Sequence, residues 1–158
     1  MLDQTDLRII DLLQEDSSIS NAVLAQKLAL KASTVYERVK KLERSRIIHR
    51  YAAQVDPDAV GKPILAFIRL IVGPTTDYSK SKKHVAELCI REPSVLECHV
   101  MAGEDDYLLK VRAANMRELE LLIEKIRSST TITNSIISSV LSSPKETFKV
   151  TPSVTIGH

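Results

Sequence analysis

The stretch SNAVLAQKLALKASTVYERVKKLERSRIIHRY, residues 20–51, decides how the N-terminal part of this chain folds. Its pattern predicts two short helices joined by a tight turn, NAVLAQKL and a second helix over about residues 33–45, followed by an extended segment. In the second helix Val35, Val39 and Leu42 recur at helical spacing, which places them on one side. The stretch therefore predicts a helix-turn-helix whose second helix turns an apolar stripe toward a core.

The opposite side of this second helix is polar and largely cationic. A helix that enters the major groove of DNA needs cations that neutralise phosphates and polar tips that reach base edges. The side chains expected to face outward are Ser33, Glu37, Lys40, Lys41 and Arg44. The alternative interpretation is a solvated surface helix with a basic bias.

Positive charge is concentrated along this helix and the segment that follows it. Residues 31–50 hold seven Lys and Arg against two Glu, a net charge of +5. Residues 1–30 hold two cations against five acidic groups, a net of −3, and the whole chain carries +2, so residues 51–158 sum to zero. A surface charged only for solubility would spread its cations more evenly, so this partition favours DNA binding.

The composition argues against several other classes of protein. The 158 residues are 44% hydrophobic and 27% charged, which is typical of one or two small globular domains. Trp is absent and aromatics are few, which disfavours stacking platforms for single-stranded nucleic acid. No apolar run reaches the ~18–20 residues that a membrane span needs, and the N-terminus does not resemble a signal peptide. We therefore expect a cytoplasmic protein.

The two cysteines, Cys89 and Cys98, lack the close spacing of a metal motif or a paired disulfide motif. We expect them to be reduced thiols in the core of a cytoplasmic protein. A zinc site that includes His84 or His99 is the weaker alternative, because no CxxC or HxxxH pattern supports it. No metal site is predicted.

The N-terminal region is predicted to form three helices around one small core. The first helix covers residues 2–14 with Asp3 as its cap, and Ser20 caps the second. Thr34 with Glu37 fits the capping-box pattern for the third helix. Residues 47–52 begin with a β-branched pair and are expected to form a strand or wing that leaves the bundle. The apolar residues assigned to the helices are Leu2, Leu7, Ile9, Ile10, Leu13, Val23, Leu24, Leu28, Val35, Val39 and Leu42.

A cluster of Pro and Gly between residues 52 and 63 marks the domain boundary. Beyond it, the patterns predict strand 64–72, helix 78–91, strand 95–102, strand 107–113, helix 116–128 capped by Asn115, and strand 132–141. This βαββαβ order is the ferredoxin-like pattern, with two helices on one face of a four-stranded antiparallel sheet. The tail after residue 142 is expected to be a short edge strand around residues 148–154 or a partly ordered end.

The sheet face without helices is predicted to be too apolar to remain in water. We expect it to pack against a second subunit, so that the protein is a homodimer. A monomer with one solvated sheet face is the alternative, since antiparallel sheets tolerate it.

Three blocks of the chain resemble the Lrp/AsnC family, the leucine-responsive or feast/famine regulators of bacteria and archaea. The blocks are LDQTDLRIIDLLQEDSSIS, STVYERVKKLERSRIIHRYAAQVDPDAVG and VLECHVMAGEDDYLLKVRA, and they occur in the family's order. The residues that fall on positions usually kept in the family are Arg38, Leu42, Glu43, Ile48, Tyr51, Gly61, Gly103, Asp106 and Tyr107.

The resemblance implies an α+β chain with two domains. Residues 1–51 would be a winged helix-turn-helix DNA-binding domain of three helices, residues 52–62 a linker, and residues 63–158 a ferredoxin-like RAM/ACT-like domain. This second domain would bind an amino acid effector and mediate assembly into dimers and octamers. The resemblance places the effector in a cleft between subunits, lined partly by residues 103–107.

The residues of this loop are chemically suited to an amino acid. Gly103 can expose peptide N–H groups to a carboxylate, and the acidic side chains can accept from an ammonium group. The effector-binding candidates are Gly103, Glu104, Asp105, Asp106 and Tyr107. The alternative is a solvated hairpin turn, because Gly and Asp are common in turns; a divalent-cation site is weaker still.

The chain departs from the family at several positions of the helix-turn-helix and of the last strand. The family usually has Gly where Ala29 and Arg46 stand, and Ser where Lys31 stands. If Arg46 takes a positive φ, its conformation costs about 1 kcal/mol or more, while its charge could strengthen a phosphate contact. Changes over residues 131–137 put the effector response, more than the fold, in question.

These observations together predict a sequence-specific, DNA-binding transcriptional regulator that responds to a small amino acid. Its DNA-binding candidates are Lys31, Ser33, Thr34, Glu37, Arg38, Lys40, Lys41, Arg44, Arg46 and Arg50. For Arg38, a structural salt bridge is an equally good interpretation. The alternatives are an ACT-like amino acid sensor and an architectural DNA-binding protein without an effector. No catalytic residues, resident cofactor or membrane partner are expected, because nucleophile, phosphate-loop and metal motifs are lacking.

Overall fold

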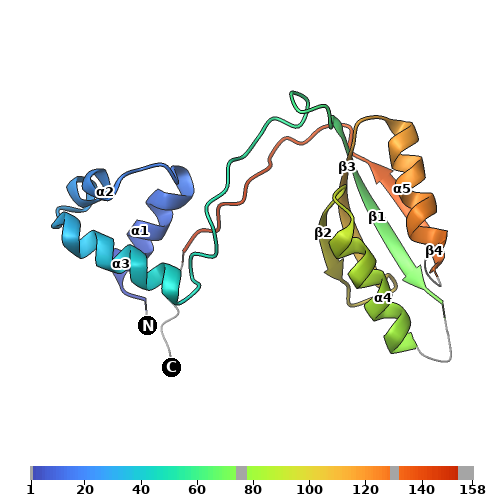
Figure 1. The fold of residues 1–158 in the computed structure, drawn as a ribbon, viewed down its shortest axis with the longest axis horizontal. Helices are drawn as coiled ribbons and strands as arrows, with labels where there is room; N and C mark the ends of the chain where they lie inside the picture. Colours follow the sequence, from blue (N-terminus) through green and yellow to red (C-terminus); the bar gives the residue numbers. More distant parts are fainter. Residues whose placement is uncertain (1, 74–77, 129–131, 153–158) are drawn as a thin grey trace. The chain divides into compact units, whose positions relative to one another are not determined.

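A computed structural model describes residues 2–73, 78–128 and 132–152 of the chain (Figure 1). These residues form two compact units. The first contains residues 2–54 together with the tail from 145 to 152, and the second lies within residues 55–144.

Three helices build the N-terminal unit: α1 (Gln4–Glu15), α2 (Asn21–Leu28) and α3 (Ala32–Arg44). The predicted caps of the first two are confirmed. The Asp3 carboxylate accepts from the N–H of Asp6 at 2.8 Å and the Asp6 carboxylate accepts from the N–H of Asp3, which is a capping box. The Ser20 hydroxyl accepts from the N–H of Val23 at 3.3 Å.

The core of this unit is the one that the apolar spacing predicts. The fully or nearly buried side chains are Ile9, Leu24, Ala25, Val35, Val39 and Leu42, and partly buried residues such as Ile10, Leu13 and Leu28 pack against them. Val23 is an exception, because its side chain is 42% exposed. Leu24, the next residue, points into the core, so the side chain of Val23 points away from it.

Two predictions for the third helix and its exit are wrong. The N-cap of α3 is Lys31, without a side-chain cap bond, so Thr34 lies inside the first turn and does not cap the helix with Glu37. Residues 47–52 form no strand. The β-branched pair does not leave the bundle: the N–H groups of Ile47 and Ile48 both bond the carbonyl of Leu42, and Ile48 packs on the helical core.

Both α2 and α3 end in a left-handed residue that is not glycine. Ala29 has a φ of 53° and Arg46 a φ of 55°, so the positive φ considered for Arg46 is confirmed. At each end two backbone bonds close the helix, Leu30 N–H to Ala25 and Ala29 N–H to Gln26, then Ile47 N–H to Leu42 and Arg46 N–H to Glu43. This is the Schellman motif, which normally has Gly at the left-handed position.

The second unit is a ferredoxin-like βαββαβ fold, as predicted. Its elements are β1 (Ile64–Val72), α4 (Tyr78–Arg91), β2 (Val95–Val100), β3 (Tyr107–Ala113), α5 (Met116–Ser128) and β4 (Ile132–Ser139). The strand order is β2-β3-β1-β4 and all pairs are antiparallel. The predicted Asn115 cap is confirmed, because its side-chain oxygen Oδ1 accepts from the N–H of Glu118 at 2.9 Å.

The two helices cover one face of this sheet (Figure 1). The buried side chains of β1 and β3 on that face alternate along the strands and enclose a core with Val85 and Cys89 of α4 and Leu119, Leu122 and Ile126 of α5. The other face carries the alternate residues. They include Phe67 and Ile71 of β1, Leu108 of β3, and Ile136 of β4, which is 39% exposed.

The tail contacts α1 within the N-terminal unit. The side-chain amide of Gln14 donates to the carbonyl of Val150 at 2.9 Å and accepts from the N–H of Val150 at 2.7 Å. The ammonium of Lys149 lies 2.8 Å from the carboxylates of Asp11 and Glu15. The edge strand predicted around residues 148–154 does not form over residues 148–152: the backbone of Val150 bonds the side chain of Gln14 instead of a neighbouring strand. Residues 153–154 lie outside the described residues.

Candidate nucleic-acid interface and effector loop

The outward face of α3 is exposed and polar, as the spacing of Val35, Val39 and Leu42 requires. These three residues bury one side of the helix, so the residues on the opposite side reach solvent. Six of the predicted DNA-binding residues are exposed and make no side-chain hydrogen bond or ion pair with the described part of the chain: Lys31, Ser33, Thr34, Glu37, Lys41 and Arg44. Their polar groups are therefore available to an external partner.

Lys40 is on the same face but is partly engaged within the helix. Its ammonium lies 2.7 Å from the carboxylate of Glu43 and 5.9 Å from the centre of the Tyr36 ring. The Glu43 carboxylate also accepts from the hydroxyl of Tyr51 at 3.1 Å. The hydrogen bond from Lys40 lowers the pKa of Glu43 and, reciprocally, raises the pKa of Lys40. Lys40 stays charged, but a DNA phosphate would have to displace the Glu43 carboxylate to pair with its ammonium group.

Arg38 is committed to the internal structure of the unit. One guanidinium nitrogen lies 2.6 Å from the carboxylate of Asp3 and 2.6 Å from that of Asp6, and so joins α3 to the first turn of α1. The Asp6 side chain is almost completely buried. The backbone N–H of Asp6, and then Arg38, hold the pKa of Asp3 below its ordinary value, and the two carboxylates raise that of Arg38. The structure thus favours the salt-bridge interpretation of Arg38.

Arg46 and Arg50 follow α3 and are exposed, without a side-chain partner in the described residues. Arg46 occupies the left-handed position that ends α3, so the direction of its side chain is set by the strained turn. Both cations extend the basic surface beyond the last turn of the helix, where a phosphate backbone would pass if α3 entered a groove.

The sequence reasoning missed Tyr36. Its ring is 46% exposed beside Lys40 on α3. Its position directly after Val35 places it about 100° from the buried stripe, which was the available signal. Because an aromatic residue next to apolar ones is usually assigned to a core, the exposed position of Tyr36 is easily overlooked. Its hydroxyl can donate or accept a hydrogen bond at a DNA backbone.

The loop between β2 and β3 places the five effector candidates in two groups. Gly103 has a φ of 143°, and a Cβ there would meet nothing within 4 Å, so the backbone is open on that side. Glu104 is exposed, and Asp105 is partly exposed with its carboxylate 3.4 Å from the guanidinium of Arg69. Gly103 therefore has an open backbone and Glu104 an exposed carboxylate, whereas the carboxylate of Asp105 is held by Arg69.

Asp106 and Tyr107 point the other way, into the protein. The Asp106 carboxylate accepts from the N–H of Val72 at 2.7 Å and lies 2.7 Å from the ammonium of Lys82. The Tyr107 hydroxyl donates to the carbonyl of Lys82 at 2.7 Å. Both side chains are buried, so they fix the base of the loop against β1 and α4.

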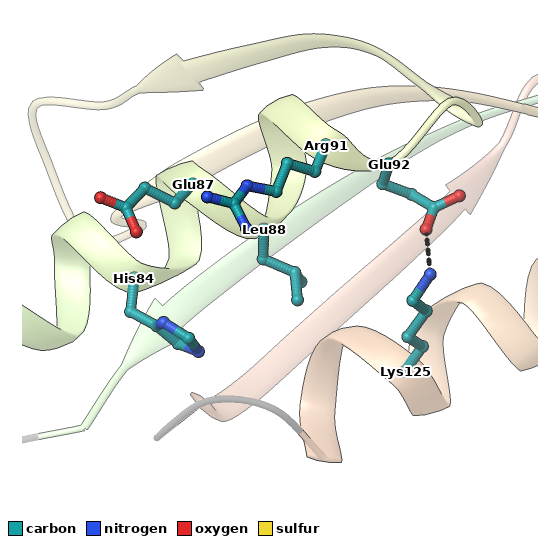
Figure 2. Close-up of a pocket in the computed structure, with 6 residues that line it drawn as sticks. All are labelled: His84, Glu87, Leu88, Arg91, Glu92 and Lys125. Carbon is teal, nitrogen blue, oxygen red and sulfur yellow. Dashed lines mark hydrogen bonds and ion pairs between the residues drawn. The ribbon is translucent and has the colours of Figure 1, made fainter.

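A shallow hollow of about 290 Å³ lies between α4 and α5, and none of the predicted site residues lines it (Figure 2). The residues lining it are His84, Glu87, Leu88, Arg91, Glu92 and Lys125. Glu92 and Lys125 close one end through an ion pair at 2.6 Å, and Leu88 forms the apolar floor. The sequence patterns did not predict this hollow.

Within residues 2–73, 78–128 and 132–152, no three His, Cys, Asp or Glu side chains gather as they would around a metal ion. No helix of this part of the chain is long and apolar enough to cross a membrane.

Two family models match the chain, one for each unit. The AsnC-type helix-turn-helix domain matches residues 2–43, and the Lrp/AsnC ligand binding domain matches residues 65–150. The first match includes most of α3, and the second includes the loop after β2.

Curated relatives and solved structures agree with these matches. The HTH-type transcriptional regulator LrpC of Bacillus subtilis is 34% identical over 140 residues, 88% of this chain and 94% of the relative. The HTH-type transcriptional regulator FL11 of Pyrococcus furiosus is 34% identical over 128 residues, 81% and 82% of the two chains. The crystal structure of the transcriptional regulator NMB0573/L-Met complex from Neisseria meningitidis superposes with a TM-score of 0.88 at 30% identity, over 95% of this chain and 96% of that one. The chain therefore belongs to the Lrp/AsnC family of helix-turn-helix transcriptional regulators.

Proposed function

We propose that this regulator binds double-stranded DNA with the outward face of α3 in the major groove. One observation carries the proposal: apart from Lys40, which Glu43 holds, the polar side chains opposite the buried stripe of this helix are exposed and have no partner in the described residues. The proposed base and groove contacts are Ser33, Thr34, Glu37, Lys41 and Arg44. Carboxylates and hydroxyls at such positions read base edges, and bidentate Arg reads guanine.

The cations at the two ends of α3 are proposed to contact phosphates. Lys31 precedes the helix, and Arg46 and Arg50 follow it, all three exposed. Lys40 contributes charge once Glu43 releases it, whereas Arg38 acts indirectly by holding α3 on α1. Specific recognition then comes from the helix, while the flanking cations fix its register along the duplex.

We further propose that a small amino acid binds at the loop after β2. The related structure from Neisseria meningitidis is a complex with L-Met, and the loop of this chain has an open backbone at Gly103 with carboxylates at Glu104 and Asp105. Peptide N–H groups would hold the carboxylate of the effector, and the acidic side chains its ammonium group. Asp106 and Tyr107 keep the loop in place. No resident cofactor and no catalytic step belong to this proposal.

The proposed domain division is a DNA-binding domain over residues 1–51, a linker over 52–62 and an effector-binding and oligomerisation domain over 63–158. We propose a homodimer formed by the helix-free sheet face, where Phe67, Ile71, Leu108 and Ile136 are half-buried or exposed, with assembly of dimers into an octamer. A cytoplasmic location is part of the same proposal, since the DNA of the cell is the partner.

The experiment that tests the function is selection from a pool of fragments of the protein's own genome. The purified chain is mixed with the pool at low and at physiological salt, with and without a mixture of amino acids. Selective retention of a few fragments that changes with amino acids supports the proposal. Uniform retention indicates an architectural protein, and amino acid binding without any retention indicates a sensor that does not use DNA.

A further inference from the structure

The last turns of α1 carry acidic residues at the end of the helix where negative charge is least favourable. Asp11 and Glu15 lie four positions apart and therefore on the same side of the helix, and the last turn contains no basic residue. Two like charges at this spacing repel each other, and the helix dipole disfavours negative charge near a C-terminus. The helix by itself therefore leaves these two carboxylates uncompensated.

The compensating charge comes from the other end of the chain. The ammonium of Lys149 lies 2.8 Å from the carboxylates of both Asp11 and Glu15. Beside it, the side-chain amide of Gln14 accepts from the N–H of Val150 at 2.7 Å and donates to its carbonyl at 2.9 Å. A residue offers both groups to one neighbour when its backbone is extended, as in an antiparallel pair. This side of α1 thus recognises a lysine and the extended backbone of the residue that follows it.

These contacts are polar and open to water, which makes them reversible. The side chains of Lys149, Asp11 and Glu15 remain 32%, 43% and 57% exposed. Phe148 and Val150 are both 73% exposed, so the segment buries little apolar surface. Ion pairs that are this exposed contribute little stability and weaken with salt. The segment therefore behaves as a ligand of α1 and not as part of its core.

We propose that the side of α1 formed by Asp11, Gln14 and Glu15 is a docking site for an extended, lysine-bearing peptide segment, and that its occupant is the C-terminal segment of the same chain, held as a releasable strap. Because the strap is attached to the same molecule, its effective concentration at α1 is on the order of millimolar. A free peptide of the same sequence should therefore fill the site only when the strap is weakened.

The strap gives the sheet unit a second covalent route to α1. It starts where β4 ends, at Val140, whose N–H bonds the carbonyl of Leu65 at 2.9 Å. It ends on α1, whose first turn holds Arg38 of α3 through ion pairs. A change at the end of β4 can therefore reach α1 without passing through residues 52–62. Docking of the strap needs no DNA, so it is tested separately from the proposed function.

A carbodiimide tests the docking in the full chain, because it joins an ammonium to a carboxylate only where the two are in contact. Treatment at low salt, followed by digestion and mass spectrometry, should link Lys149 to Asp11 or Glu15. Lys145, which is exposed in the same tail and has no partner in the described residues, is the internal control and should form no link to α1. In a mixture of unlabelled and ¹⁵N-labelled chains, the links should join residues of one chain.

One variant removes the backbone recognition without removing a charge. In Gln14→Ala the yield of the Lys149 link should fall several-fold, and high salt should lower the yield in wild type. Gln26→Ala, at an exposed glutamine of α2, is the matched control and should give the wild-type yield. Ala is the best helix former, so both variants should fold. A yield that changes neither in Gln14→Ala nor in high salt would overturn the proposal.

A peptide tests whether the site accepts the segment from outside the chain. The peptide KETFKVTP, residues 145–152 with both ends blocked, is added at millimolar concentration together with the carbodiimide. It should link to α1 of the full-length Lys149→Ala chain, whose own strap is weakened, and several-fold less to wild type. Failure of Lys149→Ala to capture the peptide would overturn the proposal. So would wild-type links from Lys149 that spread over many carboxylates or join only two different chains.

Discussion

The left-handed position of Arg46 couples the stability of the N-terminal unit to its proposed contact with DNA. Glycine is relaxed at a positive φ, whereas an L-residue with a side chain is strained there by about 1–2 kcal/mol. Arg46 has a φ of 55° and its side chain has no partner in the described residues. The strain is therefore not offset within the unit, and the cation is free to act outside it.

Arg46→Gly should stabilise the unit and weaken DNA binding at the same time. The relief of about 1–2 kcal/mol is reduced by roughly 0.4–1 kcal/mol, because Gly gives the unfolded chain more freedom. The net gain is about 1 kcal/mol or slightly less, which raises the melting temperature of a unit of this size by about 4–8 °C per kcal/mol. Loss of one phosphate contact should lower the salt slope of DNA binding by about 0.9.

Ala29→Gly is the matched control. Ala29 has nearly the same φ, 53°, and ends α2 with the same pair of backbone bonds, but it carries no charge. It should give a similar stabilisation without a change in the salt slope. Calorimetry of the full chain gives the melting temperatures, and fluorescence anisotropy on a selected fragment gives the slopes.

The reasoning would be refuted if Arg46→Gly were neutral or destabilising while Ala29→Gly stabilised, because the same strain should be relieved in both. The phosphate contact alone would be refuted if Arg46→Gly kept the wild-type affinity and salt slope. Arg46→Asn then separates charge from backbone, since Asn tolerates the left-handed region without a cation.

Three other predictions follow from individual contacts. Arg38→Ala should destabilise the N-terminal unit by about 2 kcal/mol, because it leaves the buried Asp6 carboxylate without its cation. It should leave the salt dependence of DNA binding by the folded protein unchanged. Chemical denaturation measures the change in stability, and DNA binding at several salt concentrations measures the slope. The pKa of Asp3 in the folded unit lies below its ordinary value of 3.8. The ionised Asp3 therefore contributes its full stabilisation above pH 3.8, and this stabilisation is lost as the pH falls through the lower folded pKa. The stability of Asp3→Asn should fall less steeply with acid than that of wild type, and identical acid-unfolding curves would contradict this prediction. Asp106→Ala should lower the stability of the sheet unit by about 1–3 kcal/mol, because it leaves the Val72 N–H unpaired. It should weaken amino acid binding, measured by isothermal calorimetry, without altering DNA binding in the absence of effector. Unchanged amino acid affinity would contradict the proposal that Asp106 anchors the effector loop.

The strands and helices could be predicted where a strong local pattern existed. The predicted bounds of β1, β3 and α5 agree with the structure, because each of these segments buries one regular face. The exits of the helices were harder to predict. The Ile47–Ile48 pair has the local preference of a strand, but both backbone N–H groups bond to the end of α3 and the Ile48 side chain packs on the helical core.

The site was only partly predictable, since contacts between distant residues carry no local signal. The outward face of α3 follows from helical spacing alone, whereas the engagement of Arg38 by Asp3 and Asp6 depends on how α1 packs. For the same reason, nothing in the GEDDY pattern shows that Asp106 and Tyr107 point inward while Gly103 and Glu104 stay open.

The central claim is that the outward face of α3 contacts DNA. Its most direct test compares wild type with Lys41→Ala/Arg44→Ala on one selected fragment over a range of salt concentrations. Lys83→Ala/Arg127→Ala, which removes two exposed cations of the sheet unit, is the matched control. The account predicts that the α3 variant keeps its circular dichroism spectrum, binds more weakly and loses about 1.8 from the salt slope, while the control binds as wild type. Equal affinity and equal slopes for all three proteins would contradict it.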